Sequence, residues 1–181
     1  MTMGFTPYET ENIVFIDTEF SDLDPYTGEL LSIAIVKLSG EELYLELDYE
    51  GPCTEWVKKH IVPTLKATKI SKQRAIELIQ AFLGDSLPYA VAFVDNYDVI
   101  YLTKLFGAGN LPFRWMTIDF ASVLFVLGVN PVKFLAGEKG AVSFYKKLGI
   151  KIGKYRQHYA LDDARLLRDV WLKMSSASQN K

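Results

Sequence analysis

Apolar residues occur along this chain mainly in short runs that have the length of a β-strand. Residues 12–18 (NIVFIDT) are apolar and β-branched until they reach acidic positions, which is typical of a buried strand. Two further runs, ELLSIAIVKL and EELYLELDY, flank Ser39 and Gly40 and predict an antiparallel hairpin. The run YAVAFV after Pro88 is continuously apolar, as in a central strand covered on both faces, and residues 114–118 (RWMTI) predict a last short strand. The pattern therefore predicts five strands.

Helical patterns occupy most of the remaining sequence. Candidate helices cover residues 53–61, the stretch from a capping Ser71 to a glycine stop at Gly84, the run YDVIYLTKLF, and residues 119–128, 138–148 and 158–175. Crossover helices of this kind cover the faces of a sheet that contains parallel strands. The predicted fold is α/β, with a central mixed five-stranded sheet flanked by helices.

Length and composition indicate one domain. The chain has 181 residues, 49% of them hydrophobic, which fits a single globular domain over residues 1–181 with its core at about 12–175. Residues 176–181 form a polar end that we expect to be frayed. No apolar run approaches the roughly 20 residues that cross a bilayer, and no basic segment precedes an apolar one near the start. A cytoplasmic protein without a membrane partner is therefore expected.

Charge and cysteine content exclude some classes of site. Cys53 is the single cysteine, so the chain forms no intramolecular disulfide and has no thiol pair for zinc. The net charge of −2 argues against indiscriminate coating of nucleic acid, so any such contact must be local. The two histidines, His60 and His158, are the main candidates for acid-base chemistry near neutral pH. His60 lies among lysines and is expected to be a surface or helix-end residue outside the site.

Two carboxylates stand at the end of the first predicted strand. Side chains alternate along a strand, so Asp17 and Glu19 leave it on the same face. Like charges this close repel and raise each other's proton affinity, and a divalent cation removes that repulsion. The alternative is that both residues begin a solvated loop.

Further acidic residues follow in two later segments. Asp95 and Asp98 lie between the central strand and the next helix, where capping and complementing the helix dipole is an alternative role for either one. His158 precedes Asp162 and Asp163 by four and five residues, so both aspartates can reach its surroundings on one helix. The alternative there is an exposed helix face with aspartates paired to arginines.

Together, FIDTEF, the NYD after the central strand, and H-x-A-L-x-D-A near the C-terminus resemble the motifs of the DEDDh exonucleases, in the same order. The resemblance spans roughly residues 12–170, and the DTEF and LDDA wording is most similar to bacterial and phage 3'-to-5' exoribonucleases. It implies a ribonuclease H-like fold. The motifs match Asp17, Glu19, Asp98 and Asp163 as metal ligands and His158 as general base. Asp95 and Asp162 fall outside them, and Phe93 and Val94 replace a His-Asn pair found in many relatives.

The resemblance further implies a reaction. Oxygen ligands without cysteine favour Mg²⁺ or Mn²⁺, and two such ions, bridged by Asp17, would serve hydrolysis from the 3' end of single-stranded RNA or DNA. His158 would accept a proton from the attacking water. Thr18 and Phe20 are expected to contact substrate, with Phe20 as a core aromatic in the alternative. The basic residues Lys146, Lys147, Lys151, Lys154 and Arg156 either draw phosphates inward or form a solvated loop. A homodimer is expected because relatives often form one.

Three other functions remain open at this point. The first is a DNA proofreading or repair exonuclease, which sequence does not separate cleanly from an exoribonuclease. The second is a nucleic-acid-binding module that kept the fold and lost catalysis, which the presence of all five motif residues disfavours. The third is an unrelated phosphate-binding domain, which would need a glycine-rich cradle after a strand, and the sequence has none.

Overall fold

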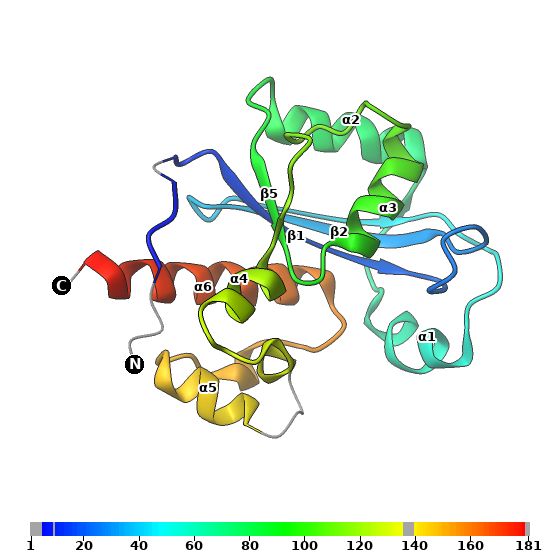
Figure 1. The fold of residues 1–181 in the computed structure, drawn as a ribbon. Helices are drawn as coiled ribbons and strands as arrows, with labels where there is room; N and C mark the ends of the chain where they lie inside the picture. The colour runs from blue at the N-terminus through cyan, green and yellow to red at the C-terminus, as the bar shows by residue number, and fades with distance from the viewer. Residues whose placement is uncertain (1–4, 9, 136–139, 180–181) are drawn as a thin grey trace.

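The computed structural model describes residues 5–8, 10–135 and 140–179, with side chains to residue 175, and its centre is a mixed sheet (Figure 1). The strands are β1 (Ile13–Phe20), β2 (Leu30–Lys37), β3 (Glu42–Leu47), β4 (Lys69–Ile70), β5 (Tyr89–Ala92) and β6 (Ile118–Asp119). Their order is β4-β3-β2-β1-β5-β6, with β1, β2 and β3 antiparallel and the remaining pairs parallel.

The mixed α/β architecture confirms the predicted fold class, but the sheet has six strands where five were predicted. The additional strand, β4, consists of Lys69 and Ile70 alone. It carries no apolar run and forms only because its backbone pairs with the end of β3. The last strand was predicted at 114–118 but lies at Ile118–Asp119, because pairing with Val91 and Ala92 of β5 selects these two residues.

The helices occur where the sequence predicted them; most have shorter ends, but α3 begins one residue earlier and α6 ends four residues later than predicted. They are α1 (Glu55–His60), α2 (Lys72–Leu83), α3 (Asn96–Phe106), α4 (Phe120–Val126), α5 (Ala141–Lys147) and α6 (Ala160–Gln179), with short 3-10 turns η1 (Val62–Thr64), η2 (Pro131–Phe134) and η3 (Ile152–Lys154). Ser71 caps α2 by accepting a hydrogen bond from the Arg74 amide, and Gly84 ends it. Residues 138 and 139, the start of one predicted helix, lie outside the described residues. The last helix continues through 176–179, which were expected to be frayed.

The sheet separates two apolar cores, and the alternation of β1 explains both. Ile13 and Phe15 face α4, α5 and α6, whereas Val14 and Ile16 face α2 and α3. Figure 1 shows these two groups of helices on opposite sides of the sheet. Each fully buried side chain of this size stabilises the fold by about 1.5–3 kcal/mol. None of the described helices combines the length and the apolar character needed to cross a membrane.

This arrangement places the end of β1 among three other segments. Asp17 and Glu19 continue the face of Phe15, which packs on α6. The neighbouring strand β5 runs parallel to β1, so the start of α3, which follows β5, lies near the C-terminal end of β1. The first turn of α6 lies on the face of the sheet that α4, α5 and α6 cover. Residues from distant parts of the sequence therefore meet at one end of the central strand.

Candidate functional site

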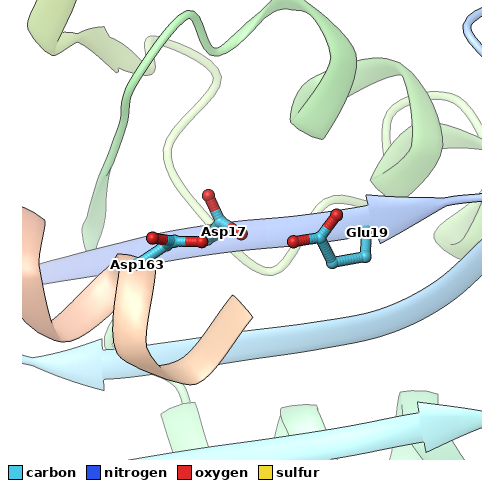
Figure 2. Close-up of side chains that lie close together, drawn as sticks. All are labelled: Asp17, Glu19 and Asp163. Atoms are coloured by element: carbon cyan, nitrogen blue, oxygen red, sulfur yellow. The ribbon is translucent and has the colours of Figure 1, made fainter. Parts of the chain in front are cut away.

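Three carboxylates converge at the end of β1. Asp17 and Glu19 extend from the strand and Asp163 from the first turn of α6, and each offers an oxygen within 4.8 Å of the others (Figure 2). Figure 2 shows the three side chains close together, Asp17 and Glu19 on the strand and Asp163 on the helix beside it. The shared face predicted for Asp17 and Glu19 is therefore confirmed.

Burial and mutual repulsion perturb the acidity of this cluster. Burial raises the pKa of Asp17 well above its usual range, and the charges of Asp163, Glu19 and Asp98 add to the effect. Burial, followed by repulsion from Asp163 and Asp98, raises the pKa of Glu19 to about 8. Burial likewise raises the pKa of Asp163 to about 7, although backbone amide groups of His158 and Tyr159 oppose the shift. These carboxyl groups therefore tend to keep their protons at neutral pH unless a cation binds between them.

Asp98 is the fourth acidic residue of the group. It lies in the first turn of α3, is buried, and accepts a hydrogen bond of 2.7 Å from the Thr18 hydroxyl. Burial raises its pKa to about 7 in spite of the hydrogen bonds from Thr18. Its charge acts on both Asp17 and Glu19. Asp98 therefore borders the three-carboxylate cluster, and Thr18, predicted to contact substrate, is engaged in holding it.

The donor set fits a hard divalent cation. All the converging ligand atoms are carboxylate oxygens, which Mg²⁺ and Mn²⁺ prefer, and the cluster contains no thiol or imidazole that would select a softer ion. Several buried carboxylates without a cation are stable only in protonated form. A bound cation removes both the repulsion and the need for protonation. Asp17, Glu19 and Asp163 are the residues that could hold it, with Asp98 at the border.

Asp162 and Asp95 are committed to other contacts. Asp162 is buried, accepts hydrogen bonds from the Arg156 side chain at 2.9 Å and from Arg165 at 2.9 Å, and is not one of the three converging carboxylates. Burial alone would raise its pKa, but these arginines lower it. Asp95 accepts a hydrogen bond of 2.5 Å from the Thr117 hydroxyl and makes no side-chain cap on α3. Both residues were left out of the ligand set on sequence grounds, and their contacts agree with that choice.

His158 lies beside the cluster, but its ring packs against aromatic residues of α1. The Trp56 ring meets the His158 ring edge-on at 4.8 Å, and the His60 ring lies 6.5 Å from it. Burial and then the proximity of His60 lower the pKa of His158. Its backbone has a φ of 55°, in the left-handed region, and the Thr64 hydroxyl donates to its carbonyl at 3.0 Å. Burial therefore favours the neutral imidazole of His158.

His60 is a helix-end residue, as predicted, but its ring lies close to that of His158. The His60 ring also lies on Trp56 at 4.7 Å. Its Nδ1 is 2.8 Å from the Trp56 carbonyl oxygen. The local sequence VKKHIVP indicates only a basic helix end. The contact arises because the η1 turn after α1 brings Thr64 onto His158.

The aromatic and apolar residues predicted near the site are partly used in packing. Phe20 stacks on Tyr101 at 4.5 Å and on Tyr97 at 5.5 Å, which supports the alternative of a core aromatic. Phe93 stacks on Phe134 at 4.4 Å. Val94 has a φ of 58° and donates its amide to Asp119 at 3.0 Å. The sequence offered no signal for this left-handed valine.

Trp56, Thr64 and Glu46 were missed by sequence reasoning. Glu46 is buried next to Ser32, which pairs with Glu19 across the sheet. It accepts a hydrogen bond of 2.8 Å from the Lys66 amide and so holds the η1 segment that carries Thr64. Its position within the alternating EELYLELDY strand was a usable signal, because a glutamate there faces the α6 side. Nothing in the sequence linked Trp56 to His158.

Comparison with known proteins gives structural matches alone. No protein-family model and no curated protein matches the chain. The zinc-bound E. coli exonuclease I complex with single-stranded DNA matches with a TM-score of 0.66 at 14% identity, over 93% of this chain and 41% of that chain. Another exonuclease I structure matches with a TM-score of 0.62 at 13% identity, over 90% of this chain and 40% of that chain. The structure of the yeast NOT1 MIF4G domain with CAF1 matches with a TM-score of 0.54 at 11% identity, over 88% of this chain and 79% of that chain.

The chain thus spans about two fifths of the exonuclease I chains that it matches. At these identities the likeness concerns the fold. The mixed sheet with helices on both faces is the architecture that the exonuclease I structures share with this chain. The comparison therefore confirms the predicted ribonuclease H-like fold.

Proposed function

We propose that this chain is a metal-dependent 3'-to-5' exonuclease that releases nucleoside 5'-monophosphates from single-stranded nucleic acid, with RNA as its main substrate. The observation that carries the proposal is the convergence of Asp17, Glu19 and Asp163, with Asp98 at their border. A fold shared with exonuclease I, solved in complex with single-stranded DNA, supports the same activity. The RNA preference rests on the similarity of FIDTEF and LDDA to exoribonuclease motifs.

Each residue has a stated role in this proposal. Asp17, Glu19 and Asp163, with Asp98 at their border, would hold Mg²⁺ or Mn²⁺ ions. When bound, such ions lower the pKa of a water nucleophile and stabilise negative charge on the leaving oxygen. Thr18 fixes the orientation of Asp98 through its hydroxyl.

His158 is the proposed general base. Its lowered pKa keeps the imidazole neutral and able to accept the proton of the attacking water at neutral pH. The backbone amide of His158 contacts Asp163, which keeps the residue next to the cluster. Trp56 and Thr64 hold the ring and the carbonyl of His158, so they position the base.

Digestion of labelled strands tests the function. Matched single-stranded RNA and DNA, labelled at either end, are incubated with the protein in Mn²⁺, in Mg²⁺ and in EDTA. We expect mononucleotides to appear first from the 3' end, faster from RNA, and to be absent in EDTA and with Asp163→Asn. Faster digestion of DNA than of RNA would favour a DNA exonuclease, an alternative supported by the structural similarity to exonuclease I in complex with single-stranded DNA. Tight binding without cleavage in Mn²⁺ would contradict the proposal and favour a binding module.

A further inference from the structure

Positive charge is concentrated in one part of the chain. Residues 120–157 contain seven of the 20 lysines and arginines but one of the 22 aspartates and glutamates, so this segment carries +6 in a chain of net charge −2. The described part of it forms α4, η2, α5 and η3, which we name the basic lobe (residues 120–135 and 140–157). The helices α4 and α5 both pack on η2, so these elements form one unit.

Five exposed lysines of the basic lobe lack acidic partners among the described residues: Lys133, Lys146, Lys147, Lys151 and Lys154. Arg156 differs, because Asp162 neutralises it at 2.9 Å. Lysines on the other side of the molecule are also neutralised, since Lys72 and Lys104 both contact Glu29. The uncompensated lysines give the basic lobe a positive field toward solvent.

These lysines are spread over η2, α5 and η3, the elements that precede α6 in the chain. The side chain of Lys133 passes 3.7 Å from where a Cβ of Gly140 would stand, at the start of α5, and Lys146 and Lys147 form its last turn. Lys151 precedes η3 and Lys154 is its last residue, after which the chain returns to α6. Tyr145, beside Lys146, is close enough to Asp163 to respond to its charge. Figure 1 shows α5 beneath α4 and the following segment rising to the start of α6.

We propose that the lysines of the basic lobe bind the phosphates of the single strand on the 5' side of the nucleotide being removed. This inference rests on the proposed exonuclease function. A strand whose 3' end lies at this carboxylate cluster needs a cationic surface elsewhere, since the rest of the chain has 13 basic and 21 acidic residues. The basic lobe provides such a surface directly before α6, whose first turn carries Asp163. An anionic membrane is the rival partner, because Val132 and Val142 are exposed between the lysines.

A charge-neutralising variant and a matched control test the inference. The test variant is K146Q/K151Q/K154Q. The control, K69Q/K72Q/R74Q, removes the same charge from exposed residues of β4 and α2, across the sheet. Binding of a single-stranded RNA of about 20 nucleotides is measured in EDTA over a range of KCl concentrations. We expect the slope of log affinity against log salt to become less steep by about 2 in the test variant, at about 0.7 per phosphate contact, and to stay unchanged in the control.

Hydrolysis in Mn²⁺ provides the second readout. The ratio of kcat/KM for the long strand to that for a dinucleotide should fall in the test variant and not in the control. Equal salt slopes for the test variant and wild type would overturn the inference. So would a test variant that binds RNA as wild type does but no longer binds anionic lipid vesicles. If wild type hydrolyses neither substrate, the proposed function fails, while the salt slope in EDTA still decides the role of the lysines.

Discussion

The buried carboxylates make the stability of this protein depend on pH and on metal, and Glu19→Gln isolates the effect. Burial and repulsion from Asp163 and Asp98 raise the pKa of Glu19 from 4.5 to about 8. Between these two values the folded protein keeps a proton that the unfolded chain has lost. The free energy of unfolding therefore falls as pH rises through this window, by about 1.4 kcal/mol per pH unit for one group.

The size of the effect follows from that window. From pH 5 to pH 8 the Glu19 contribution falls by about 4 kcal/mol, as an upper limit, because the neighbouring carboxylates share the repulsion. A glutamine at position 19 has a similar shape and no charge. In EDTA, Glu19→Gln should match wild type near pH 5 and exceed its stability near pH 8 by up to about 4 kcal/mol. For a chain of this length that corresponds to roughly 8–16 °C in Tm.

Urea unfolding and thermal scans at several pH values, with EDTA and with Mn²⁺, measure this difference. Mn²⁺ should raise the free energy of unfolding of wild type at pH 8, since a ligand at 100 times its Kd stabilises by about 2.7 kcal/mol. It should stabilise the variant, which lacks one carboxylate ligand, much less. Parallel stability curves for the two proteins between pH 5 and 8 would refute the reasoning. So would equal stabilisation of both by Mn²⁺.

Three further substitutions separate the roles of neighbouring residues. His158→Asn, which tolerates the left-handed backbone, should lower kcat by roughly 100- to 10,000-fold with Mn²⁺ affinity unchanged; near-wild-type turnover would exclude the base role. Thr18→Val should raise the pKa of Asp98 further, weaken Mn²⁺ binding in calorimetry and destabilise the fold by about 1.5–3 kcal/mol. Asp162→Asn should lose about 1–3 kcal/mol of stability in urea unfolding and keep Mn²⁺ affinity. Because its pKa is lowered, this contribution is present above about pH 4 and is lost as pH falls.

The local features of the fold could be predicted from the sequence because short-range rules govern them. Side-chain alternation placed Asp17 and Glu19 on one face, and the Ser71 cap with the Gly84 stop fixed α2 within a residue. β4 could not be predicted in this way, because two residues carry no periodic pattern and only pairing with β3 defines them.

The candidate site depended on tertiary packing that the chain does not encode locally. Asp98 and Asp95 were equally suited to capping α3, and the hydroxyls of Thr18 and Thr117 decide which one faces the cluster. The contact of His158 with Trp56 and His60 arises from a turn at Thr64. Motif order suggested that the acidic segments meet, but only the fold brings their oxygens together.

Anomalous diffraction from crystals soaked in Mn²⁺ tests the central claim most directly. The claim is that Asp17, Glu19 and Asp163, with Asp98 beside them, bind a divalent cation. We predict an anomalous peak at about 2.0–2.6 Å from oxygens of at least two of these carboxylates, lost in crystals of Asp163→Asn. Ordered carboxylates with no peak between them, under conditions where the protein in solution degrades RNA, would contradict the claim.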